Sequence, residues 1–188
     1  MNLHMLHKLF YITFFSLLIV SCKSPEARRP VQSQSGTFIK ESAQRNKEIY
    51  EAEKKYIENI IAIDTSKTYY SSENGFWYYY NKRDTTQAPK PKTGDLVEFT
   101  YSIKDLNGNS ILTEKENGLQ RYKIDQSNQE LISGVRDGIK LMNEGEVVTL
   151  LLPSYKAYGY YGIEGKLGTN IPVQSTITLR SIQYINEK

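Results

Sequence analysis

The feature that most constrains the fold is a series of short apolar segments in the second half of the chain, the clearest of which alternate with polar residues. In residues 96–103, Val97, Phe99, Tyr101 and Ile103 take one face, and polar residues occupy the positions between them. This period of two is typical of a β-strand with one buried face. Further strands are predicted at residues 76–80, 110–113, 119–124, 147–152 and 176–185.

Two asparagine-glycine pairs, at residues 74–75 and 107–108, predict where consecutive strands turn back. Both residue types accept positive φ, which the tightest hairpin turns require. The strand after the first pair, residues 76–80, is aromatic at every position, so neither of its faces is clearly directed to solvent. In the last predicted strand the apolar phase shifts between Leu179 and Ile182, which indicates a β-bulge.

One short helix is predicted among these strands. Ser133 is suited to cap its N-terminus, Val135, Ile139 and Met142 share one face, and Gly145 is placed to end it. The sequence therefore predicts an α+β fold in which a curled antiparallel sheet wraps one short helix.

An amphipathic helix is predicted before this domain, at residues 37–63, which contain neither glycine nor proline. We expect this helix to lie on its own domain. The alternative is an arm through which two copies of the chain form a dimer, although the apolar stripe is too short for several heptads. The predicted stripe consists of Ile49, Ala52, Tyr56, Ile60 and Ile63, widened by Ile57 and Ile61.

The start of the chain is predicted to be an export signal. The apolar run at residues 9–20 is shorter than the roughly 20 residues of a membrane-spanning helix and is typical of a signal-peptide core. It ends in Ile19-Val20-Ser21-Cys22, which resembles the lipobox of bacterial lipoproteins. The alternative is an ordinary secretory signal followed by a chance cysteine.

The lipobox resemblance implies a signal peptide at residues 1–21 and a lipid anchor on Cys22. Residues 22–36 are rich in Pro, Ser, Gln and charge, which predicts a flexible tether. Several acyl chains on one cysteine attach a protein firmly to a membrane. We therefore expect the protein in the cell envelope, anchored to a bacterial membrane and facing the periplasm or the cell surface.

The composition excludes the usual ionic catalysis. The only histidines, His4 and His7, precede the predicted cleavage site, and the only cysteine is the predicted anchor. The mature chain would therefore have no disulfide, no His or Cys metal site and no Ser-His or Cys-His catalysis, and no cofactor is predicted. Loss of Lys8 with the signal lowers the formal charge from +3 to +2, which gives no electrostatic case for a nucleic-acid partner.

Two segments resemble the FKBP-type peptidyl-prolyl isomerases. Residues 130–162, ELISGVRDGIKLMNEGEVVTLLLPSYKAYGYYG, have the order of that family's central run: an apolar pair, a short helix, an apolar strand, a proline and an Ala-Tyr-Gly. Residues 171–179, IPVQSTITL, are similar to its closing loop and strand. The resemblance implies an FKBP-like domain at residues 64–188 with its core at 93–186. With the lipobox and the N-terminal helix, it extends to the gliding-motility-associated lipoprotein branch.

This resemblance implies a pocket for the proline of a polypeptide. Tyr158 would give its hydroxyl to a substrate carbonyl, Tyr101 would form a pocket wall, and Ile132 would contribute its amide; these three are the predicted catalytic residues. Without the resemblance, buried aromatic residues such as Tyr122 would be interpreted as plain core. The predicted substrate-binding residues are Tyr101, Ile111, Tyr122, Leu131, Ile132, Val135, Tyr158, Ile171 and Leu179.

The sequence also departs from the family pattern. Val135 stands where the family has a floor tryptophan, Leu112 where it has an aspartate, and Leu179 where it has a floor phenylalanine. The flap, residues 159–171, is a few residues longer. The pocket is therefore expected to be deeper or differently shaped.

The predicted function is cis-trans isomerisation of X-Pro bonds in exported or envelope proteins, with a role in gliding motility. A dry apolar pocket favours the twisted amide because it removes the water that solvates the planar, charge-separated form. No proton has to move, so the predicted rate is nearly independent of pH around neutrality. Two alternatives stay open: a non-catalytic FKBP-like chaperone or binding module, and a structural subunit of an envelope or motility apparatus.

Overall fold

A computed structural model describes residues 35–85, 88–126 and 131–185. The chain divides into two units, Met1–Ile39 and Lys40–Lys188, and the sheet and the site lie in the second. The helices are α2 (Ser35–Ile63), α3 (Glu114–Asn117), α4 (Ser133–Ile139) and the 3-10 helix η1 (Ser154–Lys156). The strands are β1 (Tyr70–Ser72), β2 (Phe76–Lys82), β3 (Leu96–Asp105), β4 (Ser110–Leu112), β5 (Gln120–Lys123), β6 (Val147–Leu152) and β7 (Val173–Gln183).

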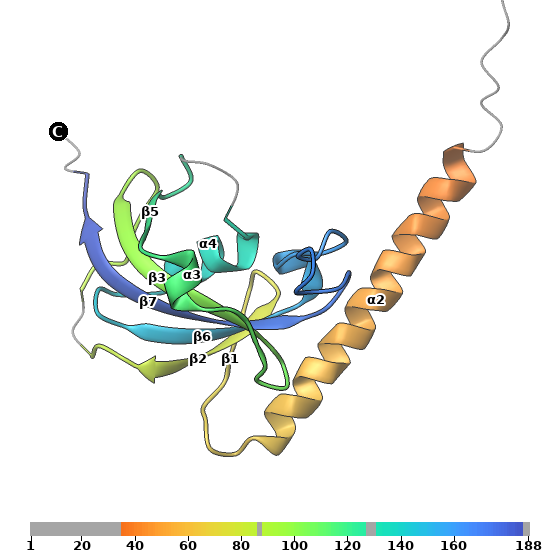
Figure 1. Cartoon of the computed structure of the whole chain (residues 1–188), viewed down its shortest axis with the longest axis horizontal. Coiled ribbons are helices and arrows are strands. Elements are labelled where there is room, and N and C mark those ends of the chain that lie inside the picture. The colour runs from red at the N-terminus through yellow and green to blue at the C-terminus, as the bar shows by residue number, and fades with distance from the viewer. Residues whose placement is uncertain (1–34, 86–87, 127–130, 186–188) are drawn as a thin grey trace, which may run out of the picture. The chain divides into compact units, whose positions relative to one another are not determined.

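The strands of the described residues form one antiparallel sheet. Its order is β1-β2-β6-β7-β3-β4, and β5 also pairs with β3. The last strand of the chain, β7, therefore lies between β6 and β3. The sheet curls around α4 (Figure 1). The predicted α+β fold, a curled antiparallel sheet on one short helix, is confirmed.

The core lies between the concave face of the sheet and α4. On β3, Val97, Phe99 and Ile103 are fully buried, as the alternating pattern predicts. They pack in one apolar cluster with Val135 and Ile139 of α4. Burying a side chain of this size stabilises a fold by roughly 1.5–3 kcal/mol, so this cluster is the main support for the site.

The predicted bulge in the last strand lies at Arg180. Leu179 pairs with Phe99, whereas Ser181 pairs with Glu98, so Arg180 is an extra residue without a partner on β3. The extra residue changes the phase of β7. As a result the side chains of Leu179 and Ile182, an odd number of positions apart, both enter the core.

The turns and the ends of α4 differ in detail from the predictions. The hairpin after β1 lies where the asparagine-glycine pair predicts it. Its loop has three residues, between the paired Ser72 and Phe76, and of the described residues in that loop only Gly75 has positive φ. Such a loop needs one residue in the left-handed region. Ser133 is the first residue of α4 and not its cap, and its hydroxyl donates to the Lys156 carbonyl over 3.3 Å.

Gly145 does not end α4, which stops at Ile139. Met142 is fully buried, as predicted, but lies beyond the helix in a turn. The N–H of Gly145 donates over 2.8 Å to the Leu179 carbonyl, so this glycine belongs to the turn that leads into β6.

Helix α2 begins at Ser35, so residues 35–36 are helical and not part of the tether. Its buried face also differs from the predicted stripe. Ile57 is fully buried and Glu53 is only 7% exposed, whereas Tyr56 is 44% and Ile63 82% exposed. Ile57 is therefore a correctly predicted member of the stripe, whereas Tyr56 and Ile63 lie outside the buried face and Glu53, which an apolar pattern cannot indicate, lies within it.

Cys22, the predicted signal peptide and the rest of the predicted tether lie outside the described residues. Within the described residues, no helix has both the length and the apolar character needed to cross a bilayer.

Candidate active site

Eight of the nine predicted substrate-binding residues belong to the apolar core cluster or pack against it. Tyr122, Val135 and Leu179 belong to the buried apolar cluster, and five others pack against it. These five come from β3, β4, the approach to α4 and the loop after η1: Tyr101, Ile111, Leu131, Ile132 and Tyr158. The fold therefore assembles the site from segments almost 80 residues apart in the sequence.

The floor of this site is closed. Val135 and Leu179 have no exposed surface, and Tyr122 is 3% exposed. The Tyr122 hydroxyl accepts the N–H of Asp125 over 3.1 Å, so it holds the turn after β5. These three residues support the site from below.

The accessible edge consists of the half-buried residues, chiefly Tyr101 and Tyr158. Burial raises the pKa of the Tyr101 phenol. Burial is also the main cause that raises the pKa of Tyr158, and the neighbouring Tyr101 phenol adds to it. Both hydroxyls therefore keep their protons at neutral pH and can donate a hydrogen bond.

Tyr158 is held by the backbone on both sides. The N–H groups of Ala157 and Gly159 donate to the Ser154 carbonyl over 2.9 and 2.8 Å. The Gly159 carbonyl in turn accepts the N–H of Asn170 over 2.8 Å, which joins the two ends of the flap. The backbone that carries the phenol is thus held in place beside the cluster.

Ile132 lies opposite, immediately before α4. Its carbonyl accepts the N–H groups of Val135 and Arg136 over 3.1 and 3.2 Å. Its own N–H has no acceptor within the described part of the chain. The resemblance implies that this amide meets a peptide carbonyl, which stays a prediction.

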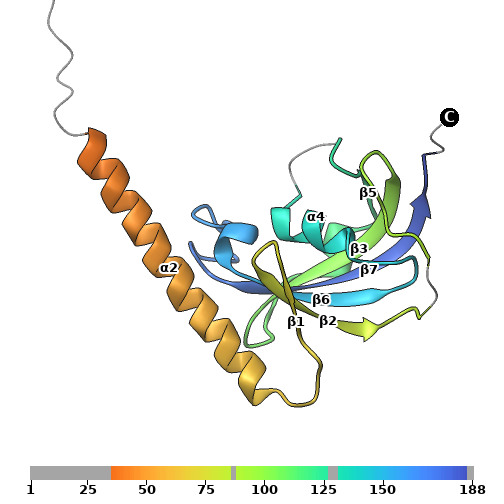
Figure 2. The same ribbon diagram turned by 180° about the vertical axis from the view of Figure 1, so that it is seen from behind.

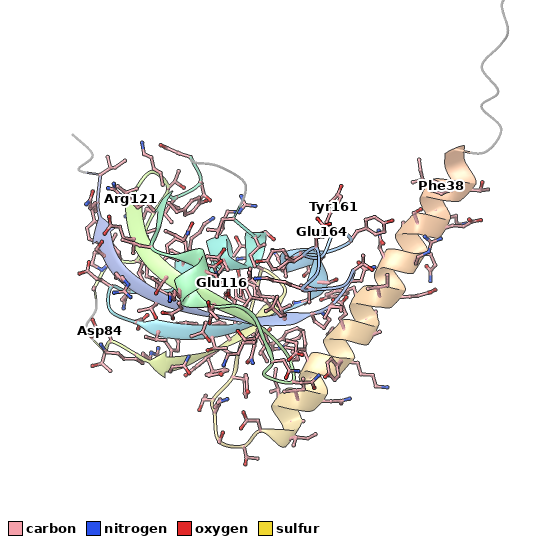
Figure 3. All side chains as sticks on the ribbon, in the orientation of Figure 1. Phe38, Asp84, Glu116, Arg121, Tyr161 and Glu164 are labelled. Carbon is pink, nitrogen blue, oxygen red and sulfur yellow. The ribbon has the colours of Figure 1, made fainter. Side chains whose placement is uncertain are left out.

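The flap is a small ordered hairpin. Ile163 and Leu167 form a bridge, and Lys166 forms an ion pair with Glu116 of α3 over 2.6 Å. This contact with Lys166, helped by Thr113, lowers the pKa of Glu116 to about 2. Tyr161, labelled in Figure 3, is 92% exposed and points away from the sheet.

Ile171 is the predicted residue that does not join the cluster. It is 38% exposed and lines a groove of about 370 Å³ together with Ile111. The same groove is lined by Tyr56 of α2. Sequence reasoning missed this role of Tyr56 because it assigned the side chain to the buried stripe.

Within the described residues, no group of three or more His, Cys, Asp or Glu side chains could hold a metal ion. The site offers an apolar surface, two neutral phenols and the backbone amide of Ile132. These groups define the class: a site on a curled antiparallel sheet that is suited to bind a peptide without transferring a proton.

The comparisons with known proteins identify this class. Residues 87–180, half of the chain, match the family described as FKBP-type peptidyl-prolyl cis-trans isomerase. The chain belongs to this family, and the assignment made from the sequence is confirmed. The narrower gliding-motility branch stays a prediction.

Two curated relatives carry the same description. The chain is 28% identical to the FKBP-type peptidyl-prolyl cis-trans isomerase FkpA of Aeromonas hydrophila over 142 residues, which is 75% of this chain and 50% of that protein. It is 27% identical over 143 residues to the probable FKBP-type isomerase FkpA of Neisseria meningitidis serogroup B, covering 76% of this chain and 48% of that protein. The chain thus spans about half the length of the curated relatives it matches.

Two solved structures share the fold. A peptidyl-prolyl cis-trans isomerase from Pseudomonas syringae pv. tomato superposes with a TM-score of 0.55 at 23% identity, over 71% of this chain and 96% of that chain. FkpA from Escherichia coli superposes with a TM-score of 0.56 at 19% identity, over 97% of this chain and 83% of that chain. At these identities the likeness concerns the fold alone.

Proposed function

We propose that this chain catalyses cis-trans isomerisation of X-Pro peptide bonds. The observation that carries the proposal is the position of Tyr158. It is a half-buried neutral phenol, fixed by the backbone on both sides, at the open edge of the apolar cluster. The match of residues 87–180 to the isomerase family supports the same activity.

The task of such a site is to lower a barrier of about 18–20 kcal/mol, which makes the uncatalysed reaction take tens to hundreds of seconds. The barrier comes from amide resonance, which water favours. A site that excludes water and holds the amide twisted binds the transition state better than the planar ground state. No acid or base is required.

The geometry supports the following proposed roles. The proline ring lies on the apolar cluster beside Tyr101. The Tyr158 hydroxyl and the Ile132 N–H donate to carbonyls that flank the proline and hold the peptide while the bond rotates. The closed floor below, formed by Val135 and Leu179, keeps water out.

The proposed clients are proline-containing polypeptides of the cell envelope or in export, with a role in gliding motility. The proposed location is a bacterial membrane surface, through a lipid on Cys22. These proposals are supported by the lipobox-like sequence and the tether composition. Dimerisation through α2 is a further proposal, supported by its exposed apolar residues, such as Ile63.

The test is a protease-coupled assay with a short X-Pro peptide and the purified protein. We expect the rate of isomerisation to rise linearly with enzyme concentration in the wild type and to fall in Tyr158→Phe. If isomerisation is not accelerated even at high enzyme concentration, the proposed activity is refuted.

A second candidate is a non-catalytic chaperone or binding module, favoured by one observation. The floor residues Tyr122, Val135 and Leu179 leave almost no surface for a ligand, so the site is shallow and could grip an apolar peptide without enclosing its proline. Binding of an unfolded protein without any isomerase activity would support this candidate.

A further inference from the structure

Helix α2 contributes a buried carboxylate that the proposed reaction does not use. Glu53 is 7% exposed. Its two oxygens accept hydrogen bonds from the N–H and the hydroxyl of Ser154, over 2.7 and 2.6 Å. We call these two hydrogen bonds the Glu53 clamp.

The Glu53 clamp is costly as a purely structural contact. Within the described residues, no basic side chain lies within 4.0 Å of the Glu53 carboxylate. Burying a carboxylate among neutral donors gives up solvation that such hydrogen bonds only partly restore. The place where the clamp holds the domain is therefore informative. Its donor, Ser154, is the first residue of η1, which ends two residues before Tyr158.

Ser154 connects the clamp to the site. Its N–H and hydroxyl are used by Glu53, and its carbonyl accepts the N–H groups of Ala157 and Gly159. These are the residues on either side of Tyr158. One residue therefore transmits the position of α2 to the segment that carries the phenol.

Other contacts fix α2 against the same segment. The rings of Tyr50 and Tyr155 meet edge to face with their centroids 5.5 Å apart. On α2 itself, Ile57 is fully buried one turn beyond Glu53. The Tyr155 hydroxyl donates over 3.1 Å to the Gly75 carbonyl, which ties the same segment to the turn between β1 and β2. Figures 1 and 2 show the segment that follows β6 beside the middle of α2.

A cavity of about 240 Å³ lies beside the clamp. It is lined by Glu53 and Tyr50 of α2 on one side and by Gly159 and Asn170 of the flap on the other. The flap therefore has free space on the α2 side, and packing alone does not fix its base. The clamp supplies the missing restraint.

We propose that Glu53 is a positioning residue for isomerisation, which acts through Ser154 to hold Tyr158 where it meets the substrate. This inference rests on the proposed function and extends it to a helix outside the family-matched residues 87–180. Without the clamp, the phenol samples positions in which it misses the carbonyl. Misplacement of a positioned group by about 1 Å can lower a rate by as much as 100-fold.

The test compares full-chain variants in the X-Pro peptide assay. Glu53→Ala should lower kcat at least fivefold with KM changed less than twofold. Glu53→Gln keeps an oxygen for the Ser154 N–H and should retain most of kcat. Glu51→Ala, which changes an exposed glutamate of the same helix, should have no effect.

A loss of stability alone is separated from positioning by a second variant, Tyr79→Ala, because Tyr79 is 8% exposed and lies outside the apolar cluster of the site. All rates are expressed per folded molecule, measured by circular dichroism under the assay conditions. If Tyr79→Ala lowers kcat as much as Glu53→Ala, or if Glu53→Ala leaves kcat unchanged, the positioning role is refuted.

Hydrogen exchange of the Gly159 amide gives a readout that does not depend on activity. This N–H donates to the Ser154 carbonyl. Its exchange should be faster in Glu53→Ala than in the wild type and unchanged in Glu51→Ala; equal exchange in all three proteins overturns the clamp. An inactive wild-type protein would instead refute the proposed function. The exchange rate of the Gly159 amide in Glu53→Ala would still show whether the clamp holds this segment.

Discussion

Replacing Gly162 by alanine should destabilise the flap far more than the same change at Gly165. Both glycines lie in the flap with positive φ, +61° and +68°. A Cβ on Gly162 would overlap the Leu167 carbonyl oxygen and lie 2.8 Å from the Gly168 carbonyl oxygen, whereas a Cβ on Gly165 meets no described atom within 4 Å. The pair therefore separates backbone strain from a steric clash.

The expected magnitudes follow from these contacts. The left-handed conformation costs an alanine roughly 1–2 kcal/mol, and both variants carry this cost. At Gly162 the backbone must also move away, which endangers the two hydrogen bonds between Ile163 and Leu167, both 2.8 Å long. Each such bond contributes about 1 kcal/mol, so we expect a total of about 3–4 kcal/mol for Gly162→Ala.

Hydrogen exchange of the Ile163 and Leu167 amides measures this difference directly, because it reports local opening of the flap. Gly162→Ala should accelerate exchange about 30-fold or more beyond Gly165→Ala, since each 1.4 kcal/mol corresponds to a factor of ten. Denaturant unfolding is a second measurement and should show a smaller difference if the flap opens before the core. Equal exchange in the two variants would show that the flap tolerates the clash and would refute the reasoning.

Four further predictions concern the site and its flap. Tyr158→Phe should lower kcat/KM about fivefold with folding unchanged, because one neutral hydrogen bond is worth about 1 kcal/mol; a rate equal to that of the wild type in the peptide assay would contradict the proposed role. The kcat should be flat from about pH 6 to 9, since burial raises the pKa of Tyr158 and keeps the phenol protonated. The same raised pKa means that its contribution to stability is complete below about pH 10 and is lost as the pH rises further, which thermal unfolding across that range measures. Lys166→Ala should return the pKa of Glu116 from about 2 toward its ordinary value, as followed by carboxyl NMR titration, and an unchanged pKa would show that Lys166 is not its cause.

Local patterns in the sequence correctly predicted elements whose buried face can be recognised from neighbouring residues alone. The alternation in β3 identifies a half-buried strand because Val97, Phe99 and Ile103 face one core. The phase change near the end of β7 predicted a bulge. Its assignment to Arg180 required the register of β7 against β3, which is a long-range property.

The errors have the same physical origin. Glu53 is absent from the predicted stripe because its partner, Ser154, is 101 residues away and no local pattern connects them. The stripe of α2 was consequently centred on Tyr56, which is 44% exposed. Gly145 was expected to end α4, but the helix stops at Ile139 and the glycine serves a turn toward β6.

The candidate site residues were predicted from the family resemblance, and the structure shows which of them are exposed and which are buried. Tyr101, Ile132 and Tyr158 lie at the accessible edge, while Tyr122 is 3% exposed and supports them from below. Ile171 lines a groove outside the cluster. Sequence position alone could not distinguish these depths, because they depend on where the flap packs.

The position of β7 has a consequence for the biogenesis of the protein. Among the described strands, β7 alone joins β6 to β3 in the sheet order, and it follows all of them in the sequence. Until residues 173–183 have been synthesised, the nascent chain holds two separate half-sheets, each with an unpaired edge that can recruit other polypeptides. The sheet can therefore be completed only after β7 has been synthesised, and a chaperone that shields those edges until then would raise the yield of folded protein.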